Sequence, residues 1–447
     1  MTDAATPSTA ALPDPGQLLR SPSYLVLLMF GAVIGAPIAA VAYFFLEAVA
    51  RTQKYLYSTL PEDLGFDSAP SWWQIPLLML AGVIVALSIT RLPGESGHKP
   101  AEGFKTGGAV LPIELPGIVL ASFATLSLGV VLGPEAPLIA IGSGLGYLAV
   151  QLLKRDAPDT AYMVIGAAGS FAAIAALLGS PLAGAFLLME AAGLAGPMMG
   201  VVLVPGLLAA GIGALVFVGL NSWTGFGTFA LSIPDLPDVG TPTISQFVWA
   251  IVIGVLAAFV GAGIKWLALT MQVVVERRML VLMPVVGLVI GVIVLVFVET
   301  TDRPSAEVLY SGQDQLPALL TGGAGWSAGA LMMLVLCKSL AYSLSLSSFR
   351  GGPVFPGMFI GAAGGMVLSH LPGLPLIAGA AMGIGAMTVA MLGLPLVSVL
   401  LVALFLQSEG LQLLPVVIVA VTVSYVASAW IRPAPASAPD ATVTPTG

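Results

Sequence analysis

An acid between prolines is the first feature of this sequence that can do chemistry. Residues 133–137 read Gly-Pro-Glu-Ala-Pro and follow the apolar stretch Thr125–Leu132. Proline is pre-organised for the first turn of a helix, so we expect a helix to begin near residues 134–137 and to end near Leu153. The first N–H groups of a helix have no partner within it and carry the positive end of the helix dipole. This helix start is therefore a predicted binding site for an anion.

A second segment repeats the arrangement later in the chain. Residues 351–356 read Gly-Gly-Pro-Val-Phe-Pro, which predicts another helix that starts with proline. Two converging helix starts would hold a partly dehydrated anion without a full positive charge, and this keeps binding weak enough for release. The candidate anion-binding residues of the two segments are Gly133, Pro134, Ala136, Gly352, Pro353, Val354 and Phe355.

The composition places these segments in a membrane protein. The chain of 447 residues is 58% hydrophobic and only 8% charged, whereas a soluble domain carries about 25% charged residues. A soluble enzyme and a nucleic-acid-binding protein are thereby excluded, and the net charge of -7 also argues against a groove for nucleic-acid phosphates. Because the chain has 1 cysteine and 2 histidines, we expect no metal site. We also expect no cofactor.

The apolar segments differ in length. Ser23–Ala50 and Trp72–Thr90 are long enough to cross a membrane, since a crossing helix needs about 20 apolar residues. Other apolar runs are shorter and are interrupted by glycine and proline, namely 138–153, 164–178, 181–195, 354–368 and 396–406. Short helices inside a membrane are tolerated where protein or a polar cavity surrounds them, although glycines also let helices pack closely. We expect an all-α polytopic membrane protein with many short, broken and tilted helices.

The sequence also contains an internal repeat. Residues 137–146 and 356–365 share Pro, Ile and two Gly at matching positions, and residues 179–182 and 393–396 share Gly, Pro and Leu. Chance similarity is the alternative, but two matches in the same order favour a duplication. Repeats with interrupted helices are typical of transporters that bind substrate near the membrane midplane. We expect disordered tails at 1–20 and 432–447, a first membrane repeat at 21–220, a connecting loop at 221–245 and a second repeat at 246–431.

Glu135 is the most informative residue of the chain. A charged acid inside a membrane costs about 2–3 kcal/mol or more unless it faces water or a partner. At the start of a helix, its carboxylate would take the position of the anion itself, so we interpret Glu135 as a gate. The alternative is a glutamate that only caps the helix.

These segments resemble the CLC family of chloride channels and anion/proton exchangers. Residues 125–137 are similar to the family's stretch that ends G-[KR]-E-G-P, whose glutamate is the external gate and falls on Glu135. Residues 166–184 resemble the family's next segment, and residues 351–356 are similar to its G-G-x-F-x-P motif. The resemblance extends over about residues 22–430. It implies an inverted-repeat fold, a pore in each subunit and a homodimer. The chain is expected to be a divergent, prokaryotic-type member of the family without the cytoplasmic regulatory (CBS) domains.

The sequence departs from the family pattern at four positions, the first of which is Pro134, where the family has a basic residue before the gating glutamate. Residues 96–100 read Ser-Gly-His-Lys-Pro where the family has G-S-G-I-P, so Gly97 stands at the serine that touches the central anion, and His98 follows. The resemblance thus adds Gly97 and His98 to the candidate anion-binding residues. The internal proton glutamate of exchangers matches Ala191. Its neighbour Glu190 is a candidate for an internal proton path, although one residue along a helix rotates the side chain by about 100°. The late pore tyrosine of the family has no counterpart.

Together these observations predict transport of small inorganic anions, chloride or a similar ion, through a CLC-like pore in which passive flux is favoured over proton-coupled exchange. The alternatives are an anion/proton antiporter for chloride or fluoride, a transporter of another class with broken helices and, least favoured, an intramembrane enzyme. We expect no enzymatic activity. The expected location is the cell (plasma) membrane, as an integral multi-pass protein. The expected partners are the anion, protons in the antiporter case, the lipid bilayer and a second copy of the chain, but no nucleic acid.

Overall fold

The structure is a computed structural model that describes residues 20–104, 110–154, 156–193, 197–227, 233, 236–237 and 239–431. The expected tails at 1–20 and 432–447 lie, apart from Arg20, outside the described residues. Within these ranges the backbone forms helices and one isolated β-bridge. The expected all-α architecture is therefore confirmed.

The first half of the chain contributes eight α-helices among the described residues. These are α2 (Pro22–Lys54), α3 (Leu60–Asp63), α4 (Gln74–Arg91), α5 (Leu115–Ser127), α6 (Glu135–Leu153), α7 (Asp159–Leu177), α8 (Pro181–Ala191) and α9 (Pro197–Thr224). A π-helical turn, Tyr55–Thr59, joins α2 to α3, and 3-10 turns form at Pro93–Ser96, Pro100–Glu102 and Pro112–Glu114. Helix α9 extends four residues past residue 220, the expected end of the first repeat. The helix stops at Thr224 because Gly225 follows it with a positive φ of 72°, a conformation that commonly ends helices.

The second half begins with α10, just before the expected position. Its helices are α10 (Ile244–Val275), α11 (Met279–Thr301), α12 (Leu316–Thr321), α13 (Ala328–Ser348), α14 (Val354–Leu368), α15 (Leu376–Leu392), α16 (Pro395–Phe405), α17 (Gln407–Gln412) and α18 (Leu414–Ile431). Short 3-10 turns form at Glu276–Arg278, Ser305–Glu307 and Gly323–Gly325.

Seven helical stretches of the described chain are long and apolar enough to cross a membrane. They include α2 and α4, which contain the two spans expected from the sequence. Helices α8 and α16 have only 11 residues each, so each is roughly 16 Å long and too short to cross a hydrocarbon core of about 30 Å. The expected mixture of full-length and short helices is confirmed, and the chain is an integral, multi-pass membrane protein.

Glycines let the short helices pack closely in both halves. A Cβ added to Gly142 of α6 would overlap the backbone of Gly169 in α7, and a Cβ added to Gly361 of α14 would overlap the backbone of Gly383 in α15. The pairs α6/α7 and α14/α15 are thus built in the same way. The glycine content therefore reflects both interrupted helices and close helix packing.

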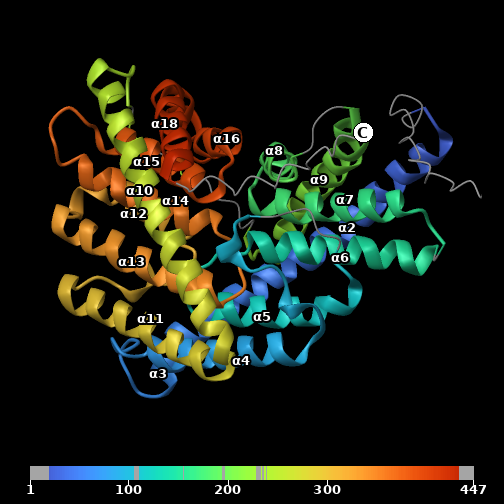
Figure 1. The fold of residues 1–447 in the computed structure, drawn as a ribbon, viewed down its shortest axis with the longest axis horizontal. Helices are drawn as coiled ribbons and strands as arrows, with labels where there is room; N and C mark the ends of the chain where they lie inside the picture. The colour runs from blue at the N-terminus through green and yellow to red at the C-terminus, as the bar shows by residue number, and fades with distance from the viewer. Residues whose placement is uncertain are drawn as a thin grey trace, which may run out of the picture.

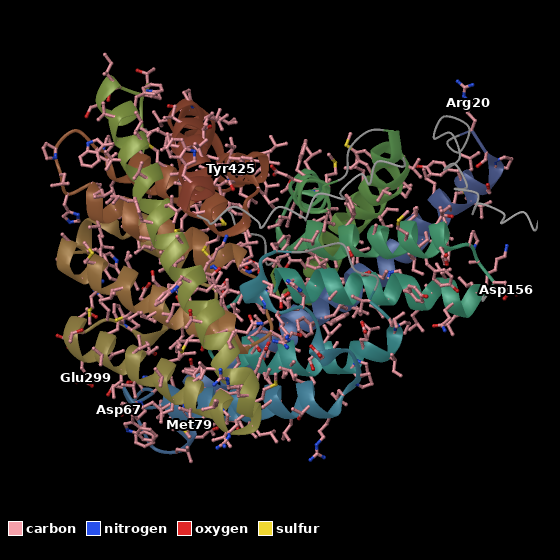
Figure 2. The ribbon with its side chains drawn as sticks, viewed as in Figure 1. Arg20, Asp67, Met79, Asp156, Glu299 and Tyr425 are labelled. Carbon is pink, nitrogen blue, oxygen red and sulfur yellow. The ribbon has the colours of Figure 1, made fainter. Side chains whose placement is uncertain are left out.

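The two halves lie side by side. Figure 1 shows α2 to α9, coloured blue to green, beside α10 to α18, coloured yellow to red, with α4 packed against α11. The charged residues that Figure 2 labels lie at the edge of the molecule: Arg20, Asp67, Asp156 and Glu299. The few charged side chains that are buried, among them Glu135, Lys338 and Arg350, are therefore exceptions inside a mostly apolar interior.

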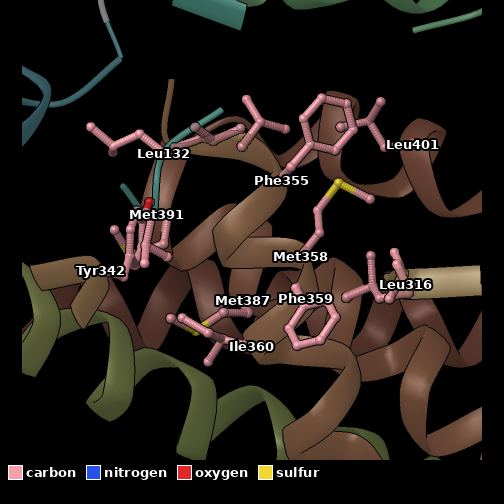
Figure 3. Close-up of a cluster of buried hydrophobic side chains, with 14 of the residues drawn as sticks. Leu132, Leu316, Tyr342, Phe355, Met358, Phe359, Ile360, Met387, Met391 and Leu401 are labelled. Atoms are coloured by element: carbon pink, nitrogen blue, oxygen red, sulfur yellow. The ribbon is translucent and has the colours of Figure 1, made fainter. Parts of the chain in front are cut away.

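The buried core is shared between the halves. Figure 3 shows Leu132 of the first half in one cluster with Tyr342, Phe355, Met358 and Phe359 of the second half. Because these side chains surround the starts of α6 and α14, the packing that holds the fold together also fixes the candidate site.

Candidate anion pathway

The two predicted helix starts meet at a pair of glycines. Gly133 and Gly352 form an antiparallel bridge in which each N–H donates to the other's carbonyl oxygen, with N···O distances of 2.8 Å and 2.6 Å. Pro134 is the N-cap of α6, and Pro353 is the N-cap of α14. The bridge thus brings the positive ends of two helix dipoles together from different halves of the chain.

Glu135 lies between these helix starts. It is the first residue of α6, and its side chain is fully buried, with 0% exposed. Its Oε1 accepts a hydrogen bond from the backbone N–H of Phe355, in the first turn of α14, at 2.9 Å. Its Oε2 has no hydrogen-bond partner among the described residues. The carboxylate of one helix therefore lies on the N-terminus of the other, where an anion would bind.

This position is available only because both bridged residues are glycine. A Cβ on Gly133 or on Gly352 would overlap the carboxylate of Glu135. Neither glycine has a positive φ, so the requirement is the close approach of a side chain and not an unusual backbone conformation. Val354, the first residue of α14, is also fully buried at this junction.

Tyr342 of α13 supports the junction from the second half, and sequence reasoning missed it. Its hydroxyl donates to the carbonyl oxygen of Pro353 at 2.8 Å. On the same helix, Ser345 Oγ accepts a hydrogen bond from the N–H of Val131 at 3.2 Å. These two contacts hold both segments that lead into the bridge, so α13 positions the site. The hydroxyl hydrogen of Tyr342 is donated to Pro353 and is not available to an anion.

A cavity of about 600 Å³ adjoins the junction. Ala136 and Gly351 line it, as do the predicted site residues Gly97 and His98. The Nε2 of His98 lies 2.9 Å from the carbonyl oxygen of Gly103. The structure thus brings Gly97, His98 and Ala136 to one vestibule, which we call the large vestibule.

A second, smaller cavity of about 70 Å³ is lined by Leu132 and Pro134. Its lining residues with polar groups in their side chains are Gln53, Tyr310, Ser311, Gln313 and Asp314. The residue before Glu135 therefore lines the small cavity, whereas the residue after it, Ala136, lines the large vestibule.

The segment next to Gly97 has a left-handed backbone. The φ angles are 78° at Gly94, 50° at Glu95, 59° at Ser96 and 94° at Gly97. A non-glycine residue in this region costs of order 1 kcal/mol or more, so surrounding contacts must hold it.

Serine contacts hold the segment from one side. Ser88 donates its single hydroxyl hydrogen to the carbonyl oxygen of Gly117 at 3.1 Å. In the 2.8 Å contact between Ser88 and Ser96, the donor is therefore Ser96. The hydroxyl hydrogen of Ser96 is consumed in this contact, so Ser96 does not replace the pore serine that the sequence lacks.

Arg350 holds the segment from the other side. It lines the large vestibule and is only 6% exposed. Its Nε and Nη2 both donate to the carbonyl oxygen of Glu95, at 3.3 Å and 3.2 Å, and its Nη1 donates to the carbonyl oxygen of Phe349 at 3.4 Å. From the sequence, the position of Arg350 beside the second Gly-Gly-Pro segment allows two interpretations, positive potential at the pore entrance or a simple interfacial anchor. Its buried place in the wall of the large vestibule favours the first.

Glu190 lies away from the junction, at the start of another helix. Its Oε1 accepts the N–H of Leu396 at 3.0 Å, and its Oε2 accepts the N–H of Val397 at 2.8 Å. Both donors belong to the first turn of α16, whose own N-cap residue, Leu394, makes no side-chain cap. Glu190 therefore caps α16 across the two halves, while its neighbour Ala191 lines the large vestibule. A role of Glu190 in a proton path stays a prediction.

Comparisons with known proteins identify a family for this chain. The profile of the family described as "Voltage gated chloride channel" matches residues 81–429. A relative from Escherichia fergusonii, described as "Putative ion-transport protein YfeO", is 26% identical over 360 residues, which cover 80% of this chain and 82% of the relative.

Solved structures share the fold. A CLC-type fluoride/proton antiporter has a TM-score of 0.71 at 22% identity, covering 90% of this chain and 95% of that chain. A slow cyanobacterial Cl-/H+ antiporter has a TM-score of 0.72 at 19% identity, covering 91% of this chain and 97% of that chain. Because the family profile matches most of the sequence, the chain belongs to the voltage-gated chloride channel family, the CLC family that the motif around Glu135 resembles.

Proposed function

We propose that the chain carries small inorganic anions, chloride or a similar ion, across the cell membrane along a path that connects the large vestibule with the small cavity past Glu135. The observation that carries this proposal is the buried Glu135 carboxylate at the joined starts of α6 and α14. A carboxylate and an anion compete for the same N–H donors and the same helix dipoles.

In this mechanism Glu135 is the gate. The ionised carboxylate occupies the anion position, accepts the Phe355 N–H and repels an approaching anion. Protonation removes the negative charge and weakens the hydrogen bond to Phe355, so the side chain leaves the site and the anion enters. The two helix starts then offer N–H groups and partial charges, which bind an anion without retaining it.

Passive flux is favoured over proton-coupled exchange. The position that matches the family's internal proton glutamate is Ala191, which cannot carry a proton, and the adjacent Glu190 gives both carboxylate oxygens to the backbone of α16. The second candidate function is an anion/proton antiporter for chloride or fluoride. It is favoured by the solved structures of similar fold, which are described as fluoride/proton and Cl-/H+ antiporters.

We further propose that the chain lies in the plasma membrane and has no enzymatic activity. We also propose that two copies form a dimer with one pore in each subunit. Leu182 at the start of α8 and Leu396 at the start of α16 occupy matching positions of the repeat and are 58% and 54% exposed. Such apolar faces on adjacent short helices suit a partner subunit. Detergent-corrected light scattering should give the mass of two chains. Fully active monomers would contradict the dimer.

The function is tested with purified protein in liposomes by recording anion efflux and proton movement together. We expect efflux of chloride or fluoride without proton movement at a fixed ratio. Uphill proton pumping driven by an anion gradient would favour the antiporter. If no small inorganic anion is moved, the proposed function is wrong.

A further inference from the structure

We infer that the guanidinium of Arg350 forms an anion-binding subsite in the large vestibule that prefers planar oxyanions with two adjacent oxygens, such as nitrate or a carboxylate, over a halide. This inference rests on the proposed function and names the class of anion that the vestibule selects. It also identifies the group that supplies hydrogen-bond donors where the family's pore serine is missing.

The donors of Arg350 can be accounted for one by one. A guanidinium has five N–H groups in a rigid, planar fork. The side edge, formed by Nε and Nη2, donates to the carbonyl oxygen of Glu95, and one N–H of Nη1 donates to that of Phe349. Two N–H groups remain, one on each terminal nitrogen, and they have no acceptor among the described residues. Because Phe349 is the preceding residue, we assign its carbonyl oxygen to the Nη1 hydrogen that points back toward Cδ. The two remaining N–H groups then form the end of the fork and are parallel.

Two parallel N–H groups match two oxygens of one anion. Bidentate pairing of guanidinium with a carboxylate-like group adds geometric specificity to charge attraction. A spherical halide gains the charge attraction but cannot accept two linear bonds from parallel donors. The remaining edge of Arg350 therefore discriminates between anions of the same charge by their shape.

The guanidinium is held rigidly in the wall of the vestibule. Arg350 as a residue is more than nine-tenths buried. Its backbone N–H donates to the Oγ1 of Thr125 at 3.4 Å, which fixes the backbone that carries the side chain. A fixed side chain loses little conformational freedom on binding, so more of the interaction appears as affinity. The hydroxyl hydrogens of Ser96 and Tyr342 are consumed by protein acceptors, which leaves Arg350 as a charged donor next to Gly97.

Nearby carboxylates limit the affinity of this subsite. Glu95, Glu102 and Glu276 are close enough to act electrostatically on Arg350, and Glu114 lines the same cavity. Glu276 is itself paired with Lys99 at 2.7 Å. The negative charges of these carboxylates offset part of the positive charge of Arg350. An anion can therefore bind to Arg350 and also leave it, as a transport path requires.

The test measures anion binding by the full chain in detergent. Thermal unfolding is followed while nitrate, formate or chloride is titrated at constant ionic strength, because a ligand that binds the native state raises the melting temperature with its concentration. We expect half-saturation by nitrate and formate at concentrations about 10-fold below that of chloride, since one additional charge-assisted hydrogen bond is worth about this factor.

Arg350→Lys keeps the charge and removes the parallel fork, so it should abolish the preference while chloride binding persists. Glu95→Gln is the matched control, because it removes a nearby negative charge and leaves the backbone oxygen that Arg350 contacts. It should tighten the binding of all three anions together and leave the preference unchanged. Arg303→Lys changes an arginine outside the vestibule, which donates to Gly325, and should have no effect.

Two outcomes would overturn the inference. One is a wild-type protein that binds nitrate and formate no more tightly than chloride, a result that does not depend on whether a variant folds. The other is a preference that survives in Arg350→Lys. Liposome flux separates this failure from that of the proposed function. Chloride flux without an oxyanion preference removes only the Arg350 subsite, whereas oxyanion binding without any flux removes the transport function.

Discussion

The backbone N–H of Phe355 and the Oε1 of Glu135 form a hydrogen bond of 2.9 Å that links the two halves of the chain at their helix starts. The other carboxylate oxygen is buried without a partner among the described residues. Leaving a buried charged oxygen unsatisfied costs about 1–3 kcal/mol or more. The buried carboxylate of Glu135 is thus held by backbone N–H groups at the helix starts, the Phe355 N–H among them, and by the two helix dipoles. All of these interactions favour the ionised form, which is the basis of the proposed gate.

Replacing Glu135 by Gln should imitate the protonated gate. We expect the wild-type anion flux to rise as the external solution is acidified, because the protonated carboxylate no longer competes with the anion. In Glu135→Gln the flux should equal or exceed the wild-type flux and should no longer depend on external pH. Anion binding should also tighten, since one negative charge has left the site. Flux at several external pH values, measured in liposomes, checks this expectation.

The matched control for this variant is Glu409→Gln. Glu409 is also buried, and its Oε2 accepts the N–H of Val239 at 3.1 Å, far from the bridge in sequence. Its replacement should leave the pH dependence intact. If Glu135 is only a helix cap, its variant loses about 0.5–2 kcal/mol of stability and keeps the wild-type pH profile. That result would make Glu135 structural.

Gly352→Ala tests the fit of the gate from the other side. The new methyl group would overlap the Glu135 carboxylate, so the carboxylate must move away or the bridge must open. We expect a flux that depends less on external pH and a loss of stability of about 1–3 kcal/mol from overpacking. Gly364→Ala, also on α14, is the control because its Cβ would meet no atom within 4 Å. Wild-type pH dependence in Gly352→Ala would contradict the close fit.

Much of the candidate site follows from the sequence because its signals are local. Proline fixes the first turn of a helix, and α6 and α14 indeed begin at Glu135 and Val354, as the two motifs predict. A single acid in a long apolar region indicates function for the same local reason. The short lengths of α8 and α16 follow from the interrupting glycines and prolines.

The contacts between the halves could not be predicted in this way. The repeated Gly-Pro segments suggest two helix starts that converge, but they do not reveal the hydrogen-bonded pairing of Gly133 with Gly352. No pattern in the sequence relates Glu190 to the start of α16, which it caps. The direction of Arg350 depends on the left-handed backbone at Glu95, which the Ser-Gly-His motif does not reveal. Tertiary packing decides such contacts, so only the folded chain displays them.

Lys338→Met should destabilise the protein although it removes a buried charge. Lys338 Nζ donates to the carbonyl oxygens of Glu307, Val308 and Leu309 at 2.9, 3.1 and 3.2 Å, and it lies 4.3 Å from the ring centroid of Phe359. Methionine fills the volume but leaves these carbonyl groups without their donor, and we expect a loss of about 2–3 kcal/mol. Thermal unfolding in detergent measures it. A variant as stable as the wild type would show that relief of the buried charge compensates for the lost hydrogen bonds.

The cap that Glu190 provides to α16 can be removed and then rebuilt. Glu190→Ala deletes both acceptors of the Leu396 and Val397 N–H groups, so we expect the free energy of unfolding to fall by about 1–2 kcal/mol. In the first half, α8 is capped by its own Ser180, whose side chain accepts the N–H of Ala183 at 3.3 Å. The matching residue of α16 is Leu394, which has no polar side chain.

The double variant Glu190→Ala with Leu394→Ser should therefore recover most of the lost stability, because it gives α16 the local cap that α8 already has. Thermal unfolding of the wild type, both single variants and the double variant measures the recovery, and liposome flux is recorded for the same four proteins. Flux and its pH dependence should follow the wild type in the double variant. If stability is unchanged in Glu190→Ala but proton movement is lost, and Leu394→Ser does not restore it, Glu190 acts in a proton path and not as the cap of α16.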